Sequence, residues 1–314
     1  MEFIQANTTI TMTEHVVGLC KNQDYTITGQ GELNGKLFDF GVLLDGHGTN
    51  NFIDIMRIQN WKAIMSSEDP WDALYYILKE IKFPINISSG STLLMMRAFE
   101  DKIETISVGD SQIVIFKNDE YIYGTTPHNR KNLSEVQRIL KHPYYTTSKR
   151  QRNPIPSICS STSIRTVPAE YNYFVNTTLA MTQALGHNNI TGYAPERNTI
   201  FFEKSDKIDV ILGSDGLWEM ILLENHTDLV FEKDVVDILQ DKQDLLNMNA
   251  VELVAKAEAR WKKTDWICYW NPKDLTQSVI IDFDGSYDDI SVIKWSKGGM
   301  SSMNEEGAVV AADV

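Results

Sequence analysis

The chain has 314 residues, of which 42% are hydrophobic, enough for one large domain or two small ones with a buried core. Its formal net charge of −14 excludes a general nucleic-acid-binding surface, because phosphate backbones require a basic one. The start of the chain lacks a basic segment followed by an apolar one, and no apolar run approaches the ~18 residues of a membrane span, so we expect neither a signal peptide nor a membrane partner.

The cysteines indicate reduced thiols. There are three of them, far apart and without a CxxC pair: Cys20, Cys159 and Cys268. This pattern favours an intracellular protein, cytoplasmic or nuclear, and it argues against a zinc site.

Short runs rich in Val, Ile, Leu and Phe predict strands, since most are followed closely by Gly, Asp, Asn or Ser. In chain order these runs are 37–44, 92–98, 105–116, 208–212 and 278–283, and a further apolar run follows at 290–293. Two helices are predicted between them. One begins at the N-cap Asp69 with Pro70 in its first turn, and the other covers about 249–263.

Strands that come in runs, with helices between some of them, favour an α+β fold over strict βαβ alternation. Residues 142–172 are polar and predict a long loop. We therefore expect one domain at 1–297 and a flexible tail at 298–314.

Aspartates stand beside several of the predicted strands. Asp45, in Asp45-Gly46-His47-Gly48, and Asp215, in Asp215-Gly216, each end an apolar run. Asp110 interrupts the run 105–116, and Asp288 precedes the run 290–293. Carboxylates at strand ends, brought together from separate elements, form a typical site for hard cations such as Mg²⁺ or Mn²⁺. Each motif alone is also compatible with an ordinary turn.

Taken together and in order, these segments resemble the metal-dependent protein serine/threonine phosphatases of type 2C, the PPM family. The resemblance covers roughly residues 15–295. Its motifs are Asn22-Gln23-Asp24, Asp45-Gly46-His47-Gly48, Gly90-Ser91-Thr92, Val108-Gly109-Asp110-Ser111, the segment from Leu179 to Gly186, Ser214-Asp215-Gly216-Leu217-Trp218-Glu219, and the segment from Gly285 to Val292.

The resemblance implies a four-layer α-β-β-α sandwich of two mostly antiparallel sheets flanked by helices. It implies two Mg²⁺ or Mn²⁺ ions at one end, with a third ion as an option, and direct attack on phosphorus by a water that bridges the metals. The implied metal-site residues are Asp45, Gly46 (through its carbonyl), Asp215 and Asp288, together with Asp110 at the third metal and Asp24 as a weaker candidate. Glu219 matches an acidic position near Asp110, and His47 matches the general acid.

This sequence also departs from the family pattern. Where the family carries a phosphate-binding arginine, only Lys21 is available, a point charge in place of a bidentate fork. The family's Arg-Ala-Leu-Gly-Asp becomes the segment from Gln183 to His187, which loses both charges, and the family's Asp-Asn pair becomes Asp288-Asp289.

Two other phosphatase or metal-site patterns compete for the same acidic stretch. Asp282 and Asp284 follow an apolar run as in haloacid-dehalogenase-type phosphatases, but the ~30 residues that remain cannot build such a domain. A calcium loop at this place would need a bidentate Glu where Ile293 stands. Both alternatives are rejected, and these two aspartates are interpreted as the end of a strand.

The leading hypothesis is therefore a metal-dependent hydrolase that dephosphorylates phosphoserine and phosphothreonine in proteins, working as a monomer. The alternative is a pseudophosphatase, the same fold kept as a binding or regulatory module. Lys21 and Gln183, where arginines are expected, favour the alternative. The retained carboxylates count against it, because clustered acids repel one another unless a cation neutralises them.

Overall fold

The protein is described by a computed structural model that covers residues 9–19, 21–83, 89–129, 132–143, 172–174, 177–221, 228–229, 246–262, 266–269, 278–281 and 287–298. All three cysteine side chains, Asp282 and Asp284 lie outside this description. Of the predicted tail, only Gly298 is described, so the tail stays a prediction. In the part of the chain that is covered, none of the helices is long and apolar enough to cross a membrane.

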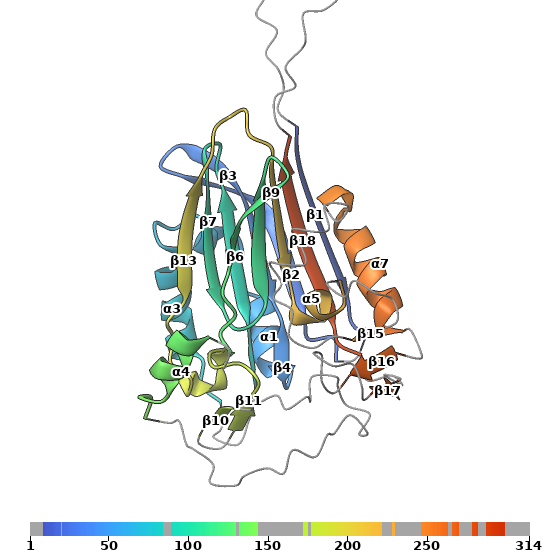
Figure 1. The fold of residues 1–314 in the computed structure, drawn as a ribbon. Helices are drawn as coiled ribbons and strands as arrows, with labels where there is room; N and C mark the ends of the chain where they lie inside the picture. Colours follow the sequence, from blue (N-terminus) through green and yellow to red (C-terminus); the bar gives the residue numbers. More distant parts are fainter. Residues whose placement is uncertain are drawn as a thin grey trace, which may run out of the picture.

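Two antiparallel sheets of five strands face each other (Figure 1). One has the order β1 (Ile10–Val17), β18 (Ile290–Lys297), β14 (Ile208–Gly213), β8 (Gln112–Lys117) and β9 (Glu120–Gly124). The other has the order β13 (Glu196–Phe201), β7 (Lys102–Val108), β6 (Leu93–Ala98), β3 (Lys36–Leu44) and β2 (Tyr25–Leu33).

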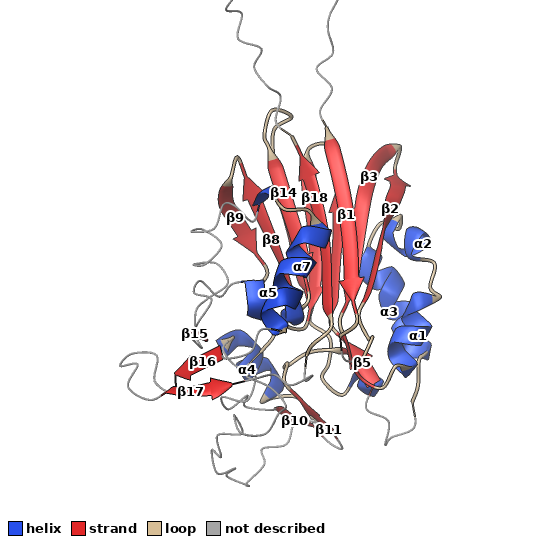
Figure 2. Ribbon diagram, turned by 90° about the vertical axis from the view of Figure 1, so that its right-hand side faces the viewer, coloured by secondary structure: helices blue, strands red, loops and turns tan. Residues whose placement is uncertain are grey.

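Buried side chains form three main layers. The layer between the sheets includes Leu43, Leu212 and Trp295, and the Trp295 Nε1 donates across it to Asp39 Oδ2 at 2.9 Å. Successive side chains of a strand point to opposite faces, so each central strand also feeds an outer layer. Each outer layer of side chains is covered by helices. The molecule therefore has four layers of secondary structure, helices, sheet, sheet and helices, which confirms the predicted α+β sandwich (Figure 2).

The helices pack by one apolar face. Helices α1 (Asn51–Arg57), α2 (Trp61–Met65) and α3 (Pro70–Glu80) cover the sheet that contains β3. Helices α5 (Asp215–Ile221) and α7 (Ala250–Trp261) cover the sheet that contains β18. Both predicted helix starts are confirmed: Asp69 caps α3 by accepting from Trp71 N at 2.9 Å, and Asn249 forms a capping box with Glu252.

The predicted run 105–116 is two strands in different sheets. Strand β7 ends at Val108 and β8 begins at Gln112, with Gly109 at φ 101° in the turn between them. A left-handed residue at this point lets the chain leave one sheet and enter the other. The turn places Asp110 at the end of the sandwich.

Small elements gather at that same end (Figures 1 and 2). A three-stranded sheet has the order β12 (Leu185–Gly186), β5 (Ser89–Ser91) and β4 (Gly46–Gly48), and the short 3-10 turn His187–Asn189 follows β12. Helix α4 (Leu133–Ile139), the β10 (Asn172–Phe174)–β11 (Thr177–Leu179) pair and the sheet of β15 (Asp228–Leu229), β16 (Trp266–Tyr269) and β17 (Ser278–Ile281) complete this end.

Candidate active site

Five aspartates reach the end of the sandwich from five separate segments. Asp24 precedes β2, Asp45 lies between β3 and β4, Asp110 is in the β7–β8 turn, Asp215 begins α5, and Asp288 lies just before β18.

The carboxyl group of Asp45 is at the centre of this cluster. Burial raises its pKa well above the usual value, and the charges of Asp215, Asp24 and Asp110 raise it further. The Asp45 side chain is also hydrogen-bonded to that of Asp215. Such charge effects act at short range, so four of the predicted metal-site residues lie near one another.

Asp24 belongs to the same cluster. Its side chain is 4% exposed, and burial raises its pKa to about 7. The charges of Asp289 and Asp215 also raise it, whereas hydroxyl groups of Ser291 and Ser214 offset part of the shift. A carboxyl group with this pKa holds a proton, or a cation, up to neutral pH.

Asp288 lies beside the start of α5, next to the segment that carries Asp215. A Cβ added to Gly216 would lie 2.1 Å from the Asp289 carbonyl oxygen and 3.3 Å from the Asp288 Cβ. Only glycine allows this approach, which brings the backbone of 288–289 beside the residue that follows Asp215.

This donor set fits a hard cation. The clustered groups are carboxylates, the ligands that Mg²⁺ and Mn²⁺ prefer. Among the described residues, no group of three or more His, Cys, Asp or Glu side chains is already arranged as a metal site. The hydrogen bond between the Asp45 and Asp215 side chains brings two of these carboxyl groups into direct contact. Number and identity of the metals stay predictions.

Gly46 is enclosed. A Cβ at this position would lie 2.5 Å from Ile53 Cγ1 and 2.6 Å from the Gln23 carbonyl oxygen. A larger residue would separate the Asp45 segment from the Asp24 segment. The predicted role of its carbonyl as a metal ligand stays a prediction.

Asp289 braces the loop that carries Asp24 and Lys21. Its two carboxylate oxygens accept from Lys21 N at 3.2 Å and from Gln23 N at 2.7 Å, and its side chain is buried. An asparagine offers one acceptor in place of two, so the departure from the family's Asp-Asn pair has a structural use here. Sequence reasoning missed this role, because nothing in the acidic stretch shows that residues 21–23 lie opposite.

Hydroxyl groups tie the Asp45 and Asp110 segments together. The Thr92 Oγ1 accepts from Asp45 N at 3.2 Å and lies 2.7 Å from Ser111 Oγ, next to Asp110. His128 closes the other side, with its Nδ1 accepting from Gly109 N at 3.0 Å. His128 lies in the loop after β9, and its buried side chain supports the β7–β8 turn. Glu219 has an exposed side chain on α5, and its predicted place near Asp110 stays a prediction.

His47 lies on β4 and contacts a second histidine. The His47 Nε2 is 2.7 Å from the His187 Nε2. Burial lowers the pKa of His47 to about 4 although a hydrogen bond with the Asp45 backbone opposes the shift, and the charge of Lys21 contributes to the lowering, which places Lys21 within electrostatic reach of this ring. Burial lowers the pKa of His187 to about 3. Both rings are therefore neutral at pH 7 in the protein as described.

Comparison with known proteins identifies the scaffold. The family model described as Protein phosphatase 2C matches residues 72–260. "Probable protein phosphatase 2C 11" of Arabidopsis thaliana is 24% identical over 252 residues, which are 76% of this chain and 59% of that protein. "Protein phosphatase 2C homolog 1" of Saccharomyces cerevisiae is 26% identical over 159 residues, 50% of this chain and 46% of the relative. The chain thus spans about half the length of these relatives.

A solved structure has the same fold. The structure of a C. elegans sex determining protein matches with a TM-score of 0.52 and 14% identity, over 93% of this chain and 65% of that one. At this identity the likeness concerns the fold alone.

Proposed function

Because the chain belongs to the protein phosphatase 2C family, we propose that it is a divalent-metal-dependent phosphatase acting on phosphoserine and phosphothreonine in proteins. One observation carries the proposal. The Asp45 carboxyl group is buried among Asp24, Asp110 and Asp215, whose charges oppose its ionisation. A site that concentrates negative charge in this way favours a cation.

Asp45, Asp215 and Asp288 would hold two Mg²⁺ or Mn²⁺ ions, with Asp24 and Asp110 as further candidates. When bound, such a pair lowers the pKa of a water molecule between the ions and neutralises charge on the phosphoryl group.

His47 would assist the leaving oxygen of the serine or threonine. In the protein as described, its ring is neutral at pH 7. A bound phosphate dianion raises the pKa of a nearby imidazole, so substrate binding would help to protonate this group. Lys21 supplies a positive charge near the ring and is the candidate contact for the phosphate.

The test is hydrolysis of p-nitrophenyl phosphate and of a phosphothreonine peptide with Mn²⁺, with and without EDTA. We expect turnover that EDTA abolishes, and a loss of about hundredfold or more in Asp215→Asn. Asp206→Asn is the matched control, because Asp206 is paired with Lys117 at 2.7 Å and has no part in the cluster.

The alternative is a pseudophosphatase, favoured by the lysine at position 21 in place of an arginine. Absence of metal-dependent turnover in the unmodified protein would support this alternative and overturn the proposal. Turnover retained in Asp215→Asn would show that the metal assignment is wrong.

A further inference from the structure

The three-stranded sheet at the end of the sandwich brings two histidines together. In its register, His47 on β4 lies opposite Gly90 on β5, and Gly90 lies opposite Gly186 on β12. His187 directly follows Gly186. The imidazole rings of His47 and His187 are tilted by only 23° and meet through their edges, with centroids 4.8 Å apart and Nε2 atoms 2.7 Å apart.

The strand between them leaves room for this contact. A Cβ added to Gly90 would lie 2.3 Å from the His187 Nε2. The side chain of His187 is 4% exposed and so has little freedom to turn away. The glycine at the centre of the sheet therefore permits the two rings to meet.

A strained turn presents His187. Three consecutive residues have left-handed backbones, with φ of 48° at His187, 54° at Asn188 and 60° at Asn189. Such residues normally occur singly, because a left-handed conformation brings the Cβ too close to the following carbonyl oxygen.

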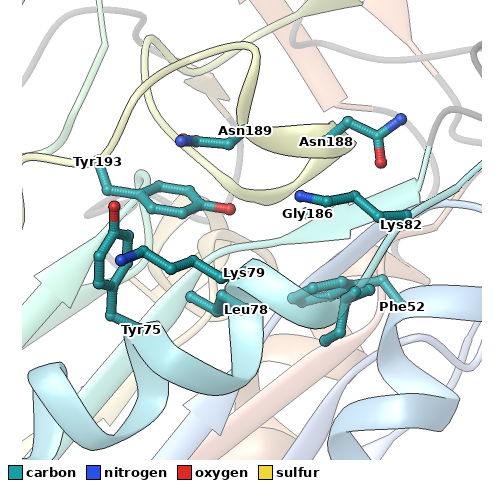
Figure 3. A pocket seen from close by; sticks show the side chains of 10 residues that line it. Phe52, Tyr75, Leu78, Lys79, Lys82, Gly186, Asn188, Asn189 and Tyr193 are labelled. Atoms are coloured by element: carbon teal, nitrogen blue, oxygen red, sulfur yellow. The ribbon is translucent and has the colours of Figure 1, made fainter.

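The side chain of Asn188 holds the turn in place. Its Oδ1 accepts from Phe83 N and its Nδ2 donates to Phe83 O, both at 2.8 Å. Figure 3 shows the turn above Tyr75, Leu78 and Lys79 of α3, across a small cavity of about 50 Å³. Local strain that is held by specific contacts is common where a side chain must be aimed.

We propose that His187 is a positioning residue for His47: the left-handed turn and Gly90 seat its imidazole against His47, fixing the ring orientation and the tautomer of that residue. The inference rests on the proposed function, in which His47 assists the leaving oxygen. Two imidazole nitrogens 2.7 Å apart have one hydrogen between them, so one Nε2 donates and the other accepts, and the state of one ring constrains the tautomer of the other.

The first test needs no catalysis. We expect the ring ¹⁵N shifts of His47 in the metal-free protein to report a single tautomer in the wild type and in Asn189→Gly, a control in the same turn that does not touch His47. In His187→Ala we expect shifts averaged between tautomers. Unchanged His47 shifts in His187→Ala would overturn the inference, whether or not the protein is a phosphatase.

The second test uses the leaving group. Phosphothreonine releases the threonine oxygen, a poor leaving group that must be protonated as it departs. p-Nitrophenyl phosphate releases p-nitrophenolate, a good leaving group that needs little help from an acid. We expect His187→Ala to lower kcat on the peptide by about tenfold to hundredfold with a similar KM, and to change p-nitrophenyl phosphate turnover by less than about threefold. Equal losses on both substrates, or no loss on either, would overturn the inference.

His187→Gln keeps a hydrogen-bonding group at a similar distance from His47. Both measurements are made on this variant if His187→Ala does not fold. We expect it to retain a single His47 tautomer and most of the peptide activity. A Gln variant that is folded but shows averaged His47 shifts would count against the inference. A wild type that is inactive on both substrates would instead overturn the proposed function, while the ¹⁵N measurement still decides the role of His187.

Discussion

At the scale of single residues, the site depends on glycines as much as on acids. Gly46, Gly90 and Gly216 each lie where a Cβ would come within 2.6 Å of a neighbouring atom. Each lies between two segments that carry candidate functional groups and lets them approach each other. The close approach of these segments is therefore set by residues that touch neither metal nor substrate.

Gly216→Ala tests this point. Its Cβ would overlap the Asp289 carbonyl oxygen at 2.1 Å, so the 288–289 backbone must move away from the start of α5. We expect a destabilisation of about 1–3 kcal/mol and a loss of Mn²⁺ affinity, although every carboxylate is kept. Urea unfolding and Mn²⁺ titration by calorimetry measure the two effects.

Gly298→Ala is the control, because the nearest atom to its Cβ would be 3.7 Å away. We expect this variant to unfold and to bind Mn²⁺ like the wild type. If Gly216→Ala also binds Mn²⁺ as tightly as the wild type, the spacing of Asp215 and Asp288 does not depend on this glycine.

At the scale of elements, the turn after β12 stores strain that one side chain offsets. Asn188→Ala removes both hydrogen bonds to Phe83 and leaves a left-handed alanine. We expect a destabilisation of about 2 kcal/mol, measured by urea unfolding. Asn188→Gly loses the same bonds but tolerates the backbone. It should therefore be less destabilised than Asn188→Ala. The reverse order would show that the backbone of the turn is not strained.

The position of a strand within its sheet determines whether it could be predicted from the sequence. The six central strands, β18, β14, β8, β7, β6 and β3, correspond to apolar runs, because strands buried on both faces need continuous apolar sequence. In the two five-stranded sheets, the strands without a predicted run are the four edge strands, β1, β9, β13 and β2. Their half-exposed, mixed sequences resemble loops, and only pairing with a neighbour makes them strands.

The candidate site divides in a similar way. Asp45, Asp110, Asp215 and Asp288 became candidates because each stands beside an apolar run, and Asp24 because of a family motif. His187 and Asp289 could not be assigned roles, because their partners are 140 and 266 or more residues away in the chain. The departure from the family motif at residues 183–187 drew attention to the segment that contains His187. It indicated only that two charged residues of the family pattern are missing there.

At the scale of the whole molecule, five segments place aspartates at one end of the folded sandwich, in a protein whose net charge is −14. Such a cluster ties folding to protons and cations. The folded pKa of Asp24 is about 7, against about 3.9 in an unfolded chain. As the pH rises from about 4 to 7, the unfolded state releases a proton that the folded state keeps. The free energy of unfolding contributed by this group therefore falls across that window, by on the order of 4 kcal/mol.

A divalent cation should reverse this loss, because it takes the place of the proton and binds only the folded site. We expect the gain in Tm that Mn²⁺ gives over EDTA to be larger at pH 8 than at pH 5, by about 3 °C or more. The lowered pKa values of His47 and His187 make the free energy of unfolding rise with pH, opposite to the effect of Asp24. Both histidines titrate in the Mn²⁺ sample and in the EDTA sample, so the difference in Tm between the two samples reduces their contribution. Asp206→Asn should show the same gain as the wild type, because the Lys117 ion pair lowers the pKa of Asp206 to about 2, outside the range measured. An equal gain at pH 5 and pH 8 would mean that protons and metal do not compete for this cluster.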